Sequence, residues 1–147
     1  MVELQHQIER AHRSGEPLTL AFADVDALKQ INDRDGHAAG DAVLRAVGAA
    51  LKAALRSYDP VVRLGGDEFL CAFTDTSIQA AAGRVAEIRR ALRPRASISV
   101  GLAELATGEN LADVTARGDA ELYRVKAARV TRVPPPWQHP ICVCVGA

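Results

Sequence analysis

The sequence has no long apolar run, few cysteines and no excess of charge of either sign. Its 147 residues contain no stretch approaching the roughly 20 apolar residues that a membrane-spanning helix needs, and its polar start is unlike a secretory signal. Three cysteines, Cys71, Cys142 and Cys144, are too few for a disulfide framework, and the last two are too close for the usual metal-binding spacing. We therefore expect a cytoplasmic protein with no membrane segment.

The charge balance excludes some classes of partner. Lysine plus arginine and aspartate plus glutamate number 18 each, so the net charge is zero. A nucleic-acid polymer or an acidic membrane would favour a basic protein, and neither is expected here. Hydrophobic residues make up 48% of the chain, which is typical of a globular protein, and the length suits one domain with one core.

The hydrophobic pattern changes repeatedly between helical and strand spacing along the chain. It predicts helices over residues 2–13, 27–33, 41–56, 77–92 and 111–129, and strands over residues 18–24, 61–64, 69–73 and 97–103. Because the two middle strands are joined through Gly65-Gly66 as a hairpin, we predict an α/β protein of the α+β type with a mixed sheet. Residues 1–129 are predicted to form the domain. Residues 130–147, with three consecutive prolines and an apolar end, are predicted as a tail, either disordered or with a strand at the sheet edge.

Several carboxylates lie near the predicted hairpin and first strand. Asp24 and Asp26 end that strand two positions apart, so both side chains leave it on one side. Asp67 and Glu68 come directly after the paired glycines. If the strand lies beside the hairpin, these carboxylates repel one another unless a cation lies between them, and Mg²⁺ is the usual hard ion for oxygen ligands. Lys29, at the start of the next helix, adds a positive charge where backbone N–H groups also favour anions.

The same residues have simpler interpretations. A Gly-Gly-Asp tripeptide by itself is usually only a hairpin turn. Asp24 and Asp26 could equally cap the helix that follows the strand. Spacing alone leaves a metal–phosphate site and a purely structural role both open.

Three longer segments extend the pattern. Arg63-Leu-Gly-Gly-Asp-Glu-Phe69 forms the first, and Asp24-Val-Asp-Ala-Leu-Lys-Gln-Ile-Asn-Asp33 with Gly36-His37 and Gly40-Asp41 forms the second. Ser99-Val-Gly101 and the spaced Asp119, Leu122-Tyr123 and Lys126 form the third. Together they resemble the GGDEF family of diguanylate cyclases, over roughly residues 18–126.

The resemblance implies a fold and a reaction. The family fold is a mixed five-stranded sheet flanked by helices, related to polymerase palms and nucleotidyl cyclases, with a signature β-hairpin. The family reaction joins two GTP molecules into cyclic di-GMP and releases two pyrophosphates, with two Mg²⁺ or Mn²⁺ ions per active site. Two domains of a homodimer face each other, so that each 3′-hydroxyl attacks the α-phosphate held by the other domain.

The resemblance also implies residue roles. It assigns metal binding to Asp24, Asp67, Glu68 and the Val25 carbonyl; catalysis to Glu68, Asp67 and Lys29; and substrate binding to Asn32, Asp41, Gly65, Gly66, Lys29 and Lys126. Asn32 and Asp41 would recognise guanine, whose N1–H and amino group suit an Asp acceptor. Asn32 could instead simply end a helix, and Asp41 could be the N-cap of the long helix after Gly40.

A second site is implied by Arg56-Ser-Tyr-Asp59, because Arg56 lies nine positions before Gly65, the family spacing for its product-inhibition motif. There Arg56 and Asp59 would bind cyclic di-GMP as an allosteric inhibitor. The alternative is a helix-terminal Arg followed by a turn Asp. Arg84, Arg89 or Arg90 could complete the site.

The sequence also departs from the family pattern. The family's opening Asp-x-Leu-Thr-Gly-Leu-x-Asn-Arg segment, which packs near the hairpin and can pair with Arg63, is absent from this sequence. A basic residue follows Lys126 one position early, as Arg129. These departures favour a rival hypothesis, a catalytically weak or inactive module that binds GTP or cyclic di-GMP for regulation.

Overall fold

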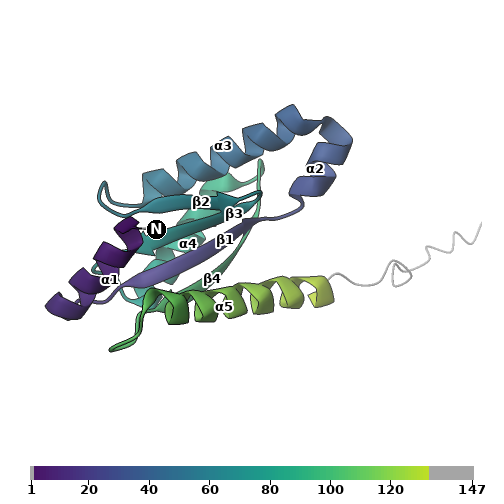
Figure 1. Ribbon diagram of the computed structural model, residues 1–147. Helices are drawn as coiled ribbons and strands as arrows, with labels where there is room; N and C mark the ends of the chain where they lie inside the picture. Colours follow the sequence, from purple (N-terminus) through teal and green to yellow (C-terminus); the bar gives the residue numbers. More distant parts are fainter. Residues whose placement is uncertain (1, 133–147) are drawn as a thin grey trace, which may run out of the picture.

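The computed structural model describes residues 2–132, in which helices surround a central sheet (Figure 1). In chain order the elements are α1 Val2–Ser14, β1 Thr19–Val25, α2 Leu28–Asp35, α3 His37–Ala54, β2 Val61–Gly65, β3 Glu68–Phe73, α4 Ile78–Leu92, β4 Ile98–Glu104 and α5 Leu111–Arg132. The predicted order of helices and strands is confirmed. Within this described part of the chain, no helix is both long and apolar enough to cross a membrane.

The sheet has the strand order β2-β3-β1-β4, and every neighbouring pair is antiparallel. The prediction of a mixed sheet is therefore wrong in its pairing. Strands β1 and β2 do run in the same direction, as do β3 and β4, but another strand lies between the members of each pair. Each helical crossover thus skips one strand, as in split βαβ folds, and the parallel strands never become neighbours.

The expected fifth strand does not occur among residues 2–132, where the sheet has four strands. The reason lies in the connections between these elements, which are too short to hold another strand and its turns. Between α4 and β4, for example, only residues 93–97 are available. The apolar end that was predicted as a disordered tail or an edge strand lies outside the described residues.

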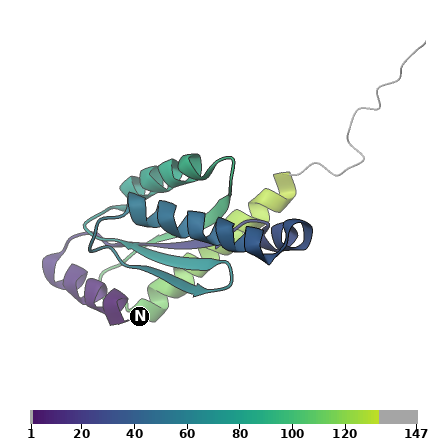
Figure 2. The same cartoon turned by 90° about the horizontal axis from the view of Figure 1, so that it is seen from above.

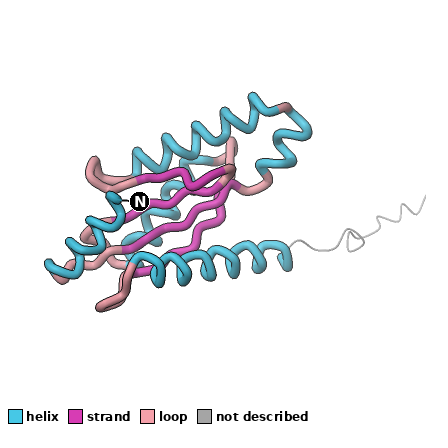
Figure 3. The backbone as a smooth tube through the Cα atoms, in the orientation of Figure 1, coloured by secondary structure: helices cyan, strands magenta, loops and turns pink. Residues whose placement is uncertain are grey.

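Strand β1 is buried along its whole length, because both faces of the sheet are covered (Figures 2 and 3). Its side chains alternate between two hydrophobic clusters, as the period of a strand requires. Ala21, Ala23 and Val25 join the cluster beneath α3 and α4. Leu20 and Phe22 join the cluster on the opposite face, beneath α1 and α5. This central position fixes the end of β1, where the predicted carboxylates lie.

Helix α5 packs unusually close to β4, and glycine makes this possible. A Cβ atom on Gly101 would lie 2.5 Å from the carbonyl oxygen of Gly118 and 2.8 Å from Cα of Leu122. Backbone atoms cannot yield to such an overlap, so a side chain at position 101 would push the helix away. The glycine of the Ser99-Val-Gly101 segment therefore sets the distance at which α5 carries Lys126 past the end of β1.

Candidate active site at the end of β1

The end of β1 brings together carboxylates that are distant in sequence. Asp24 pairs in register with Glu68 of β3 on one side and with Ser99 of β4 on the other. The backbone N–H of Val25 donates a hydrogen bond to the carbonyl oxygen of Asp67, at 3.0 Å. The Gly-Gly hairpin therefore lies beside the carboxylate strand, which is the arrangement that the metal–phosphate interpretation required.

Asp24 is a buried carboxylate, only 4% exposed, with a lysine partner from a distant helix. The ammonium group of Lys126 lies 2.6 Å from Oδ2 of Asp24. Burial raises the pKa of Asp24 above its ordinary value, the Lys126 contact opposes that shift, and the nearby Asp67 charge raises the pKa further. A buried carboxylate beside a second one gains stability from any cation placed between them.

Asp26 lies next to this group but is already engaged. Its two carboxylate oxygens accept hydrogen bonds from the hydroxyls of Ser97 and Ser99, each at 2.6 Å, and it also pairs with Arg129. Helix α2 has no side-chain cap, because Ala27 occupies its N-cap position. The interpretation of Asp24 and Asp26 as helix caps is therefore wrong. Neither Ser97 nor Arg129 had been predicted at this site, and only the displaced basic residue after Lys126 hinted at Arg129.

One open pocket of about 750 Å³ collects five of the ten residues predicted for the active site. Its charged lining includes Asp24, Asp67, Lys29 and Lys126, and Val25 also borders it. Carboxylates and ammonium groups in one hollow of this size suit a metal-bound triphosphate. Below, this hollow is called the nucleotide pocket.

Glu68 does not line the nucleotide pocket. It is exposed at the start of β3 and borders a smaller hollow of about 280 Å³, together with Leu64 and Tyr123. Lys126 lines both hollows and is their link. Glu68 therefore lies at the rim of the nucleotide pocket. It is next to Asp24 in the sheet, but it borders the smaller hollow.

The donor set at the end of β1 fits a hard divalent cation. Within residues 2–132, no three acidic, histidine or cysteine side chains gather closely enough to hold a metal ion unaided. Mg²⁺ is usually bound by only one or two carboxylates and completes its shell with water and substrate phosphates. Asp24, Asp67 and the Val25 carbonyl supply oxygen donors of that kind.

The hairpin turn is held by its own arginine. Gly66 has a positive φ of 46°, a conformation that glycine adopts without a steric penalty. The guanidinium group of Arg63 donates two hydrogen bonds to the Gly66 carbonyl oxygen, from Nη2 at 2.6 Å and from Nε at 3.1 Å. In this chain the first residue of the hairpin motif therefore stabilises the turn. Gly65 and Gly66 are both exposed, with open space where a side chain would be.

The predicted guanine-reading residues meet where α2 and α3 pack together. Gly40 is buried against the Asn32 side chain, so closely that an added Cβ would lie 2.8 Å from Cγ of Asn32. Helix α3 begins at His37 and not at Asp41, so the interpretation of Asp41 as an N-cap is wrong. Asp41 is exposed in the second turn of the helix. Its carboxylate makes no hydrogen bond to any of residues 2–132, and the Asn32 side chain of α2 packs against Gly40, the residue before it.

The predicted inhibitory residues differ sharply in exposure. The side chain of Arg56 is 38% exposed and donates to the Thr74 carbonyl oxygen at 3.2 Å. The side chain of Asp59 is fully buried. Its carboxylate accepts hydrogen bonds from the backbone N–H groups of Arg56 and Thr74, at 2.9 and 3.1 Å, and from the Thr74 hydroxyl. Arg84 lies 4.0 Å from Asp59, whereas Arg89 and Arg90 make no contact there.

The chain matches the family model described as the GGDEF domain of diguanylate cyclases across residues 1–132. It is 34% identical over 135 residues to the diguanylate cyclase DgcP of Pseudomonas aeruginosa, and 38% identical over 108 residues to DosC of Escherichia coli. These alignments cover 85% and 74% of the chain but only 20% and 22% of the two relatives. The chain thus spans about a fifth of the length of these curated relatives.

Solved structures give the same result. The GGDEF domain of DgcB from Caulobacter crescentus, in complex with c-di-GMP, superimposes with a TM-score of 0.80 at 30% identity. That match covers 86% of this chain and 81% of the other. The diguanylate cyclase SiaD of Pseudomonas aeruginosa, in complex with its activator SiaC, gives a TM-score of 0.79 at 35% identity, covering 85% of this chain and 52% of that one.

Proposed function

Because the chain belongs to the GGDEF family, we propose that it is a diguanylate cyclase domain that joins two molecules of GTP into cyclic di-GMP. The observation that carries this proposal is the nucleotide pocket, where the buried Asp24, the neighbouring Asp67 and the lysines Lys29 and Lys126 line one space. The four other hollows compared with it, all among residues 2–132, do not combine two carboxylates with two ammonium groups.

Each of these residues has a task in the proposed reaction. Lys29 and Lys126 hold the terminal phosphates as point charges. Asp24, Asp67 and the Val25 carbonyl would hold Mg²⁺ or Mn²⁺, two ions per site, which neutralise phosphate charge and acidify an attacking hydroxyl when bound. Glu68, at the rim, assists metal binding and accepts the proton of the 3′-hydroxyl.

The reaction needs two copies of the domain. One nucleotide pocket holds one GTP, so the second GTP must be presented by a partner domain whose pocket faces the first. The exposed position of Glu68 at the rim, beside the exposed Leu64 and Tyr123, supports such a face-to-face homodimer. Dimerisation then supplies the proximity of the two reacting groups.

A second candidate is a module that binds GTP or cyclic di-GMP without turnover. The observation that favours it is the Lys126–Asp24 ion pair, which occupies a carboxylate that the metal would use. In the cyclase, Lys126 must turn from Asp24 to the phosphates when the nucleotide enters. In the regulatory module, the ion pair persists.

We further propose that cyclic di-GMP inhibits the domain through Arg56 and Asp59. The partly exposed guanidinium of Arg56 supports the proposal. Within residues 2–132 only its Nη1 has partners, the Tyr58 hydroxyl, the Thr74 carbonyl oxygen and, at 4.0 Å, Asp75, so its other donors can meet a phosphate or a guanine edge at the surface. Asp59 is buried, so it would contact the ligand only after its loop rearranges, and otherwise contributes by holding Arg56 in place.

The first experiment incubates the purified chain with GTP and Mg²⁺ or Mn²⁺ at several protein concentrations and measures cyclic di-GMP by chromatography. A specific rate that rises with protein concentration supports the dimeric cyclase. Glu68→Gln should abolish turnover without changing thermal unfolding, whereas Glu87→Gln on the exposed side of α4 should retain it. Calorimetric binding of GTP with no product from the wild-type chain would favour the regulatory module instead.

A further inference from the structure

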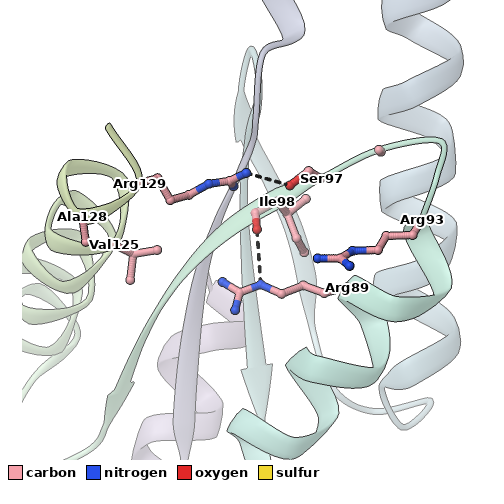
Figure 4. A pocket seen from close by; sticks show the side chains of 8 residues that line it. Arg89, Arg93, Ser97, Ile98, Val125, Ala128 and Arg129 are labelled. Carbon is pink, nitrogen blue, oxygen red and sulfur yellow. Dashed lines mark hydrogen bonds between the residues drawn. The ribbon is translucent and has the colours of Figure 1, made fainter. Parts of the chain in front are cut away.

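A second basic hollow lies beside the nucleotide pocket. It has a volume of about 430 Å³ and is formed by the end of α4, the α4–β4 connection, the start of β4 and the last turns of α5. Its lining includes Arg89, Arg93 and Arg129, with Ser97 and Ile98 between them. Figure 4 shows Arg89 and Arg93 approaching the start of β4 from the end of α4, and Arg129 approaching it from α5. This hollow is called the arginine pocket below.

The charges of the arginine pocket are not balanced. Arg129 pairs with Asp26 and also donates to the Ser97 and Ser99 hydroxyls. Arg89 uses only its Nε, which donates to the Ile98 carbonyl oxygen at 3.3 Å. Among residues 2–132, Arg93 makes no side-chain hydrogen bond or ion pair. Two of the three guanidinium groups therefore retain unused donors that point toward one space.

Helix geometry alone does not explain this arrangement. Arginines near the end of α4 are favoured by the negative charge at a helix C-terminus, which accounts for Arg89, Arg90 and the C-cap residue Arg93. It does not account for Arg129, which comes from α5 and enters the same hollow from the opposite side. Arg90 and Arg95, which are equally basic and nearby in sequence, do not line the hollow.

We propose that the arginine pocket is a binding site for a diphosphate group, either free pyrophosphate or the diphosphate of a nucleotide. Guanidinium forks donate pairs of N–H groups that match phosphate oxygens, and several forks around one hollow suit a ligand with several oxygens on each phosphorus. A single carboxylate would engage only one fork. Because Arg129 lines both the arginine pocket and the nucleotide pocket, a bound diphosphate would compete with Asp26 for it.

Binding of sodium pyrophosphate to the purified chain, measured by calorimetry in EDTA, tests this site without any turnover. The measurement uses a Lys29→Ala background, which weakens anion binding in the nucleotide pocket. Arg93→Glu should lower the affinity roughly tenfold or more, because it replaces a charge-assisted donor by a like charge. Arg95→Glu is the matched control, with the same change of net charge on the same connection, and should retain the affinity of the background.

The outcomes separate the alternatives. Equal pyrophosphate affinity in the Arg93 and Arg95 variants would overturn the proposal. It would also be overturned if the Lys29→Ala background bound no pyrophosphate and Arg93→Glu left its affinity for GTP unchanged. Arg93-dependent binding of GTP but not of pyrophosphate would identify the ligand as a nucleotide diphosphate. Thermal unfolding is measured for each variant and for a parallel Arg93→Ala variant. An unchanged unfolding midpoint shows that a loss of affinity does not come from a loss of folded protein.

Discussion

Gly40→Ala separates nucleotide recognition from stability at one position. Gly40 lies inside α3, where alanine has a helical preference over glycine worth roughly 0.5–1 kcal/mol. Its buried face touches the side chain of Asn32, which packs across from α2. An added methyl group would therefore favour the helix and at the same time displace the residue proposed to read guanine.

The size of the displacement follows from the contact. The new Cβ would lie 2.8 Å from Cγ of Asn32, whereas two carbon atoms rest at about 3.5–4.0 Å. Because Oδ1 of Asn32 lies nearer still to the new Cβ, the carboxamide must move by at least about 1 Å. It can do so, because it is the half-buried end of a side chain and not a backbone group. A misplacement of this size in a binding site costs up to roughly a hundredfold in activity.

The expected result is a KM for GTP raised roughly tenfold to a hundredfold, with thermal stability equal to or above that of the wild type. Initial rates of cyclic di-GMP formation and thermal unfolding are measured on the same preparations. Gly83→Ala is the matched control: this glycine is exposed inside α4 with nothing within 4 Å of an added Cβ. It should gain stability and keep its KM. An unchanged KM in a folded Gly40→Ala protein would refute the role of Asn32.

Three further predictions follow from the packing and charges. Burial raises the pKa of Asp24, so the folded state loses stability as the pH rises through that pKa. With EDTA present, the Asp24→Asn variant should therefore be more stable than the wild type at pH 7. This gain in stability should vanish below the ordinary pKa of 3.8. Thermal unfolding across pH shows the opposite trend if Lys126 outweighs burial. Gly101→Ala should destabilise the fold by about 3 kcal/mol, because its Cβ meets the α5 backbone; a normal unfolding midpoint would contradict the close packing. Arg56→Ala should raise the cyclic di-GMP concentration that half-inhibits the enzyme, and unchanged inhibition would exclude Arg56 from the inhibitory site.

The elements could be predicted from the sequence because each has a strong local signal. The helical period and the apolar runs located the helices and strands, and paired glycines marked the hairpin. The sequence pattern predicts the start of α3 directly after Gly40, whereas the helix begins at His37. Gly36, with a φ of 85°, is the actual break. Gly40 is inside the helix for a packing reason that only the position of Asn32 reveals.

The pairing of strands was beyond local signals. Alternation of strands and helices is the same whether a crossover lands beside its parent strand or one strand further away. The outcome depends on which strand of the hairpin, β2 or β3, pairs with β1. Here β3 is the more apolar strand, with five of its six residues buried, and it takes the central position that β2, with no buried residue, cannot fill.

The site shows the same division between local and tertiary information. The proximity of Asp24 and Asp67 could be predicted, because the end of the strand and the hairpin are each marked by a short sequence segment. The pairing of Asp24 with Lys126 depends on how close α5 lies to the sheet, and that distance is set by Gly101. Residues that look like ligands in a motif can therefore serve the scaffold, as Asp59 does with its buried carboxylate. A motif specifies which residues are present at the site, whereas burial and unused hydrogen-bonding capacity decide which of them are free to bind, and by that criterion Asp41 and Arg93 are better placed than Asp59.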